Sequence, residues 1–240
     1  MDYPVEFFKD KSWTLDYSKE NVPTFDHYAH YVNWVVEESG WPYLPVELPN
    51  ADYKSMLNEA LAIDDLFISH RNSETHQGWS SVCIHGESFD RTQAWNDYHD
   101  NKGKSSSDII YDYCSIVTDK CPITTNFIKS LPFTDLQRVR FMKLDPGGYI
   151  LPHNDRDRSI LNPLNIGLNQ PNGCIFRMKD KGDVPFKENG SACLVDISNT
   201  HSVWNNSNET RIHIIVHGTP LEEFNQLIYS SVKKLCNLDS

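Results

Sequence analysis

The sequence lacks the features that place a protein in or across a membrane. It has no apolar run of about 18 residues, the length that a membrane-spanning helix needs. The first nine residues carry Asp2, Glu6 and Lys9 and contain no apolar run of signal-peptide length. The six cysteines form no CxxC pair, and their spacing suggests no disulfide framework. We therefore expect a cytoplasmic protein with reduced thiols.

Basic residues are also scarce. The chain has 22 Lys and Arg against 33 Asp and Glu, which gives a formal net charge of −11 at pH 7. An acidic protein repels phosphate backbones and anionic lipid surfaces, so we expect neither a nucleic acid nor a membrane as partner. With 240 residues, 39% of them hydrophobic, the chain is long enough to bury a substantial core. We expect residues 1–240 to form a single domain.

The pattern of the chain changes after residue 135. Residues 1–135 show mixed helical and extended patterns, whereas residues 136–218 contain closely spaced strand patterns separated by turn signals. The predicted strands are 138–144, 149–155, 164–168, 174–178, 192–196, 202–205 and 211–217. Short strands at this spacing favour a mainly β fold with flanking helices, specifically a double-sheet jelly roll of the cupin type. We expect residues 136–218 to form this core and residues 1–135 to support it.

Residues 219–240 are predicted to form a C-terminal helix. Thr219 and Glu222 have the spacing of a capping box, and Pro220 falls at the first helical position. An apolar stripe follows at helical spacing, formed by Leu221, Phe224, Leu227, Ile228, Val232 and Leu235. We expect this stripe to cover an outer face of the sheet.

Three side chains are candidates for a metal site. His153 and Asp155 are two residues apart in a predicted strand, which places both on one face. His201 opens a later strand. Two histidines and one carboxylate leave open coordination positions, which is typical of non-haem iron(II). The pair alone carries little weight, because a second pair of this kind, His85 and Glu87, also occurs, although without a third ligand at strand spacing.

The strand 211–217 carries a second candidate group. One of its faces is apolar, and the other carries Arg211, His213, Ile215 and His217. A solvated polar face is the simplest interpretation of this alternation. If the face instead lines a cavity, Arg211 can bind a carboxylate through two parallel hydrogen bonds. Its position ten residues after His201 allows a hairpin to bring both side chains into one pocket.

Taken together, these motifs resemble a known family. The segments 153–155, 164–168, 201–205 and 211–213 are similar to the aspartyl/asparaginyl β-hydroxylase-like branch of the iron(II)- and 2-oxoglutarate-dependent dioxygenases. They also resemble the free-proline cis-hydroxylases, which share a His-x-Asp pair, a later histidine and a closing Arg-x-His strand. The resemblance covers about residues 136–218, a third of the chain.

The resemblance implies a double-stranded β-helix with iron(II) at its mouth. It implies that Arg211 binds the distal carboxylate of 2-oxoglutarate, with His213 nearby and Asn165 as a further contact. The residues that match the iron ligands are His153, Asp155 and His201. The animal β-hydroxylases have glycine at the position of Asp155, so their substrate, an Asp or Asn side chain in a folded domain, is not carried over to this chain.

The function implied is hydroxylation of an unactivated C–H group. The substrate is expected to be an amino acid-like small molecule or a peptide side chain. Dioxygen and 2-oxoglutarate are consumed, succinate and carbon dioxide are released, and ascorbate serves as reductant in vitro. Two alternatives remain at this stage. One is a cupin-type metalloenzyme that does not use 2-oxoglutarate, and this alternative assigns no function to Arg211. The other is a non-catalytic cupin-like binding module.

Overall fold

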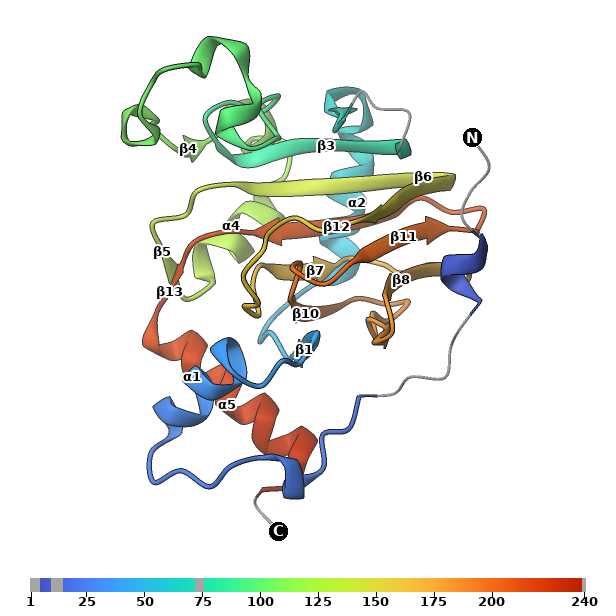
Figure 1. Cartoon of the computed structure of the whole chain (residues 1–240). Coiled ribbons are helices and arrows are strands. Elements are labelled where there is room, and N and C mark those ends of the chain that lie inside the picture. Colours follow the sequence, from blue (N-terminus) through green and yellow to red (C-terminus); the bar gives the residue numbers. More distant parts are fainter. Residues whose placement is uncertain (1–4, 10–14, 72–75, 239–240) are drawn as a thin grey trace.

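The computed structural model describes residues 5–9, 15–71 and 76–238, and most of its strands form one curled, hydrogen-bonded sheet (Figure 1). Eleven strands take part, and their pairing is antiparallel. They are β1 Tyr43–Val46, β2 Ile68–Ser69, β3 His76–Gly86, β4 Asp112–Tyr113, β6 Val139–His153, β7 Leu164–Gly167, β8 Cys174–Met178, β9 Gly182–Asp183, β10 Ser191–Val195, β11 His201–Asn205 and β12 Arg211–Val216. A separate pair joins β5 Phe133–Thr134 and β13 Thr219–Pro220.

Strand β6 links the two layers of the sheet. Its first half pairs with β12, which continues through β7 and β10 to β1. Its second half pairs with β11, which continues through β8 to β9. Two antiparallel layers that share long strands in this way form a double-stranded β-helix. The mainly β fold and the jelly roll expected from the sequence are confirmed.

The predicted break between strands 138–144 and 149–155 is wrong. Strand β6 runs through it, and residues 145–148 bulge out of register with β3. Leu144 pairs with Trp79 and Tyr149 pairs with Gln77, so Gly78 alone opposes the whole bulge. Gly78 has a φ of +67°, and a β carbon there would lie 3.2 Å from the β carbon of Asp145. The bulge bends β6, so that each half of the strand joins a different layer.

The helices cover the outer faces of the sheet. They are α1 Tyr28–Glu37, α2 Tyr53–Ala62, α3 Ser115–Thr118, α4 Pro122–Ser130 and α5 Glu222–Cys236. In Figure 1, α1 and α5 lie together below β1, whereas α2 and α4 lie behind the sheet. Short 3-10 helices span Val5–Phe8, Lys19–Asn21, Asp64–Leu66, Trp95–Asp97, His99–Asn101 and Ser106–Asp108. No helix within the described ranges combines the length and the apolarity that crossing a bilayer requires.

The predicted capping box of the C-terminal helix is wrong. Helix α5 begins at Glu222 and has Leu221 as its N-cap. Thr219 and Pro220 instead form β13 and pair with β5, a long-range contact that local capping signals do not reveal. The apolar stripe is confirmed from Phe224 onward, because Phe224 and Ile228 are buried and belong to the core between the sheet and the helices. Leu221, its first predicted member, is exposed.

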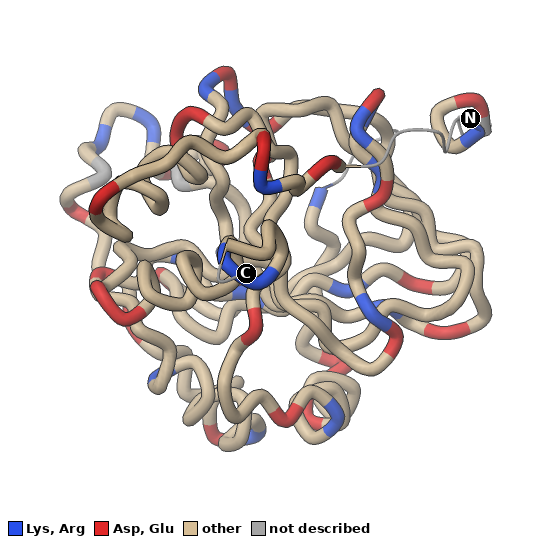
Figure 2. Tube along the Cα trace, turned by 90° about the horizontal axis from the view of Figure 1, so that it is seen from below, with Lys and Arg blue, Asp and Glu red and all other residues tan. Residues whose placement is uncertain are grey.

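Two apolar clusters fill the protein. The larger one lies between the sheet and the helices and includes Phe141, Ile166 and Ile214. The smaller one lies inside the jelly roll and includes Ile150, Phe176 and Val203. Strand β7 lies between the two clusters and is buried along its whole length. The charged residues lie outside these clusters, and Lys and Arg are interspersed with Asp and Glu along the trace in Figure 2.

Candidate metal centre and its cavity

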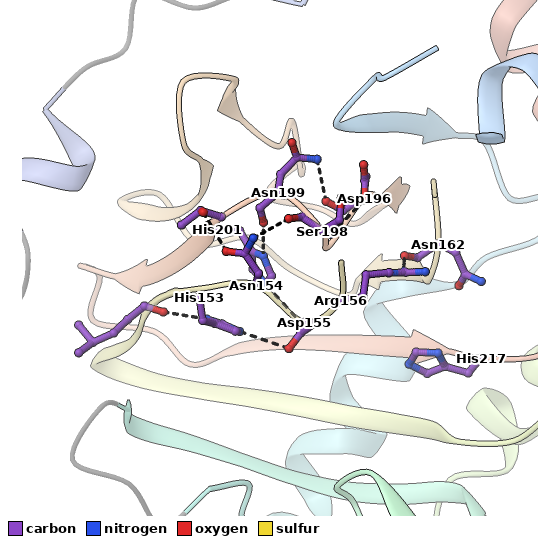
Figure 3. Close-up of polar contacts among 12 residues, drawn as sticks. His153, Asn154, Asp155, Arg156, Asn162, Asp196, Ser198, Asn199, His201 and His217 are labelled. Atoms are coloured by element: carbon purple, nitrogen blue, oxygen red, sulfur yellow. Dashed lines mark hydrogen bonds and ion pairs between the residues drawn. The ribbon is translucent and has the colours of Figure 1, made fainter. Parts of the chain in front are cut away.

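His153, Asp155 and His201 lie together at one end of the jelly roll (Figure 3). His153 ends β6, His201 begins β11, and the two residues are direct cross-strand partners. Each Nε2 atom lies 3.7 Å from a different oxygen of the Asp155 carboxylate. The three potential ligand atoms all lie within 4.8 Å of one another. This is the one group of metal-binding side chains that the described residues contain.

Hydrogen bonds fix the orientation of both imidazoles. Nδ1 of His153 lies 2.7 Å from the carbonyl oxygen of Leu151, and Nδ1 of His201 lies 2.9 Å from that of Asn199. A carbonyl oxygen can only accept, so each Nδ1 carries the proton and donates it. Burial, and to a lesser extent the neighbouring His153, lowers the pKa of His201 to about 4, so this ring is neutral at pH 7. Its Nε2 therefore presents a lone pair toward Asp155.

Asp155 reaches the site from a bend and not from the strand that the sequence predicted. Strand β6 ends at His153, and Asp155 follows two residues later. The amide of Asp155 donates to the carbonyl of Ile197 at 3.0 Å. The side chain of Asn154 donates to Ser198 and accepts from Thr200, which ties the bend to the loop that leads into β11. Sequence analysis assigned no role to Asn154, because its partners lie more than 40 residues away.

The donor set fits a divalent metal ion. Two imidazole Nε2 atoms and a carboxylate converge. Because the Nδ1–H of each ring donates to a backbone carbonyl, Nε2 is the nitrogen that each histidine has available for a metal. Ligands in adjacent positions about 2.1 Å from one metal are roughly 3 Å apart. Each histidine Nε2, now 3.7 Å from a carboxylate oxygen of Asp155, therefore needs to approach that oxygen by less than about 1 Å. Two histidines and one carboxylate with open positions suit iron(II).

Arg211 is buried in the same cavity and is held by neutral partners. Its Nε donates to Oε1 of Gln170 at 3.3 Å, and its Nη2 donates to Nδ1 of His213 at 2.8 Å. Nε2 of His213 donates to the same Gln170 oxygen at 3.1 Å, and Asn165 lies 2.8 Å from Nδ1. Burial, and to a lesser extent the positive charge of Arg211, holds the pKa of His213 well below its usual value, which keeps this ring neutral. Burial lowers the pKa of Arg211 to about 10.

The network leaves Arg211 without a negative partner. No carboxylate in the described part of the chain forms an ion pair with it, although its side chain is buried. Its Nη1 has no hydrogen-bond partner among these residues, so Nη1 and Nη2 can offer the parallel N–H pair that a carboxylate accepts. Gln170, which positions both Arg211 and His213, was missed by the sequence analysis. Its role depends on contacts across more than 40 residues.

The cavity between these groups has about 610 Å³ of empty space, part of it open to solvent. This volume is within the range of small-molecule sites. All six candidate site residues from the sequence line it or lie at its wall, and the structure therefore brings them together. The lining also contains Trp79, Ile150 and Phe176, and two residues with unassigned roles, Arg140 and His217. The interpretation of the polar face of strand 211–217 as solvated is wrong, because Arg211, His213 and His217 line the cavity.

Other residues considered from the sequence lie elsewhere. His85 contacts the backbone of Gln137 and the ring of Tyr113, and Glu87 pairs with Arg91, so this second pair holds no common site.

The chain is similar to solved structures at low sequence identity. No curated protein sequence matches the chain. Among solved structures, a prolyl-4-hydroxylase from Pseudomonas putida has a TM-score of 0.43 at 18% identity, covering 80% of this chain and 98% of that one. A prolyl hydroxylase from Trichoplax adhaerens, solved with a peptide of hypoxia-inducible factor, has a TM-score of 0.43 at 12% identity, covering 81% and 89%.

The sequence profile of one family matches residues 50–219, and its description is aspartyl/asparaginyl β-hydroxylase. The match begins well before residue 136, where the motifs begin, and it includes strand β3, which pairs with β6. It spans more than half of the 240 residues. The chain therefore belongs to the aspartyl/asparaginyl β-hydroxylase family and is a 2-oxoglutarate-dependent hydroxylase.

Proposed function

We propose that His153, Asp155 and His201 bind the iron(II) of this hydroxylase, and that Arg211 binds the distal carboxylate of 2-oxoglutarate. The observation that carries the proposal is the convergence of three lone-pair atoms beside a buried arginine without a negative partner. Burying a guanidinium is costly unless a charge compensates it. A dicarboxylate that reaches from the metal to Arg211 supplies this charge.

The other residues of the site orient and shield these groups. Gln170 and His213 hold the guanidinium of Arg211 from one side, which directs its remaining N–H groups toward the cavity. The apolar side chains of Ile150, Phe176 and Val203 line the wall and exclude water, which strengthens electrostatic contacts inside. The side chain of Asn165 contacts Nδ1 of His213 and helps to fix the position of this ring.

Bound iron(II) supplies the activation of dioxygen. In the overall reaction, one oxygen atom enters the substrate as a hydroxyl group on carbon. The other enters succinate, as 2-oxoglutarate loses carbon dioxide. We propose an amino acid-like small molecule or a peptide side chain as the substrate. The cavity would hold the C–H group of the substrate near the metal. The bound metal and Arg211 would hold the two ends of the co-substrate.

The test is succinate production by purified protein with iron(II), ascorbate and 2-oxoglutarate, measured alone and with a panel of amino acids and peptides. We expect slow succinate release without substrate and faster release with the correct panel member. His153→Ala and Asp155→Ala should lose both activities, whereas His99→Ala, at an exposed position outside the cavity, should retain them. Robust turnover in either ligand variant would overturn the assignment.

A further inference from the structure

A second arginine lies in the cavity, some distance from Arg211. Arg140 is on strand β6, and its cross-strand partner on β12 is Ile215. Arg211 pairs with Leu144, four residues farther along β6. At about 3.3 Å per residue, this separates the two arginine backbones by roughly 13 Å along the sheet. Both side chains nevertheless line the same cavity as the metal ligands.

Arg140 is buried but its charge is not compensated. Arg140 is only 7% exposed to solvent. One Nη atom donates to the backbone carbonyl of Thr92, and the other lies 3.4 Å from Nε2 of His217. Burial, and to a lesser extent Arg140, holds the pKa of His217 well below its usual value, so the ring is neutral. Its Nε2 accepts from Arg140, and its proton is therefore on Nδ1, which can donate. The buried Nε of Arg140 has no hydrogen-bond partner in the described part of the chain.

When iron(II) and 2-oxoglutarate are bound, the cavity has one positive charge that no negative charge balances. Its charged lining residues, within the described ranges, are Asp155, Arg140 and Arg211. Iron(II) and 2-oxoglutarate carry opposite charges of equal size, and Asp155 offsets one of the two guanidinium groups. One positive charge therefore remains. Because Arg211 lies where the co-substrate is proposed to bind, the remaining charge belongs to Arg140.

The location of Arg140 connects this charge to the substrate. Its partner His217 lies on the side of Asp155 away from His153 in the view of Figure 3. A group bound by Arg140 and His217 would therefore share the cavity with the metal without occupying the place of 2-oxoglutarate. A second buried arginine that lines the cavity, and whose charge no carboxylate within the described ranges pairs with, suits an anion on the molecule that is oxidised.

We propose that Arg140 and His217 bind a carboxylate of the substrate, and that this substrate carries no ammonium group beside it. The inference rests on the proposed function. Asp155 is the one acidic residue among the described cavity residues, and it is a metal ligand. An ammonium group has no carboxylate to pair with there, so its burial is unfavourable. An acylated amino acid or a peptide carboxylate fits, whereas a free α-amino acid fits poorly.

The alternative is a structural role. The bond from Arg140 to Thr92 joins β6 to the segment after β3, and Arg140 could serve only to hold that segment. A structural role predicts a loss of stability on substitution but no preference among ligands. The experiments below therefore measure ligand preference separately from folding.

The first experiment uses the wild-type protein alone. We would load it with Mn(II) and N-oxalylglycine, an unreactive analogue of 2-oxoglutarate, and titrate N-acetyl amino acids, their primary amides and the free amino acids. Calorimetry gives each dissociation constant. Loss of a charge-assisted hydrogen bond corresponds to roughly 10- to 100-fold in affinity. We expect the best N-acetyl acid to bind at least about tenfold more tightly than its amide and its free amino acid. Equal binding of acid and amide, or no binding of any N-acetyl acid, would overturn the proposal.

The second experiment compares two buried arginines of the same cavity. Arg140→Gln should weaken binding of the N-acetyl acid by about tenfold or more while the affinity for N-oxalylglycine changes less than about twofold. Arg211→Gln should show the reverse pattern, and Arg140→Lys should restore part of the acid binding. If Arg140→Gln retains the preference for acid over amide, this inference fails. If Arg211→Gln binds N-oxalylglycine normally, the proposed function fails instead.

Discussion

Replacing Gly167 by alanine should weaken the binding of 2-oxoglutarate without touching a proposed ligand. Gly167 lies on β7 directly opposite His213. An added β carbon would lie 2.9 Å from Nε2 of His213 and 3.1 Å from the ring of Phe186. Normal contact requires the imidazole to move by roughly 0.5 Å or more. The bond from Nε2 to Gln170, now 3.1 Å long, would then approach the limit for a hydrogen bond.

The cost can be estimated from these contacts. Losing a neutral hydrogen bond costs about 0.5–1.5 kcal/mol, which corresponds to roughly 2- to 10-fold weaker binding if Arg211 loses its support. Overpacking costs about 1–3 kcal/mol of folding stability. The smaller backbone freedom of alanine in the unfolded chain offsets about 0.4–1 kcal/mol. We therefore expect a net loss of about 1–2 kcal/mol in stability, together with the weaker binding.

The assay is calorimetric titration of 2-oxoglutarate into Mn(II)-loaded protein, paired with urea denaturation. Gly218→Ala is the matched control, because its β carbon would also lie 2.9 Å from a neighbour, Cδ2 of Leu136, but outside the metal cavity. The control should lose stability and keep its affinity. Unchanged affinity in Gly167→Ala, together with a confirmed loss of stability, would refute the idea that His213 positions Arg211.

Two further predictions concern stability. Burial, and next Arg140, lowers the pKa of His70 to about 2, so the unfolded chain binds more protons than the folded one between that value and 6.5. The contribution of His70 to the free energy of unfolding is therefore present above pH 6.5 and is lost as the pH falls. The loss amounts to about 2 kcal/mol between pH 7.5 and 5. In urea titrations, His70→Gln should lose less stability over this pH range than the wild type. The buried amide of Asn205 contacts the carbonyls of Leu144, Asp145 and Glu209 at 2.8–3.1 Å. Asn205→Ala should cost about 2–3 kcal/mol in urea denaturation, and an equal cost for exposed Asn206→Ala would contradict this.

Much of the site could be predicted from the sequence, because its signals are local. The alternation along 211–217 identified the face that carries Arg211 and His213, and the structure places that face in the cavity. His153 and Asp155 were correctly joined with His201 as one group. The bend that holds Asp155 was not predictable, since it depends on contacts of Asn154 with residues 198 and 200.

The parts that were missed depend on long-range pairing. Strand β3 does not alternate between polar and apolar residues as a half-exposed strand does, and its last six residues are all buried. Its place beside β6 follows only from the fold. Arg140 was seen only as part of a strand, because its partners Thr92 and His217 are 48 and 77 residues away. Thr219 and Pro220 form a strand through pairing with β5, which overrides their capping pattern.

The most direct test of the account is the number of iron ions bound per chain. Anaerobic equilibrium dialysis with iron(II) would be followed by metal analysis of the wild type and of His153→Ala, Asp155→Ala and His201→Ala. We predict one iron per chain in the wild type and a dissociation constant raised by at least about tenfold in each variant, since each removes one of three ligands. Undiminished iron binding in any of the three variants would contradict the central claim.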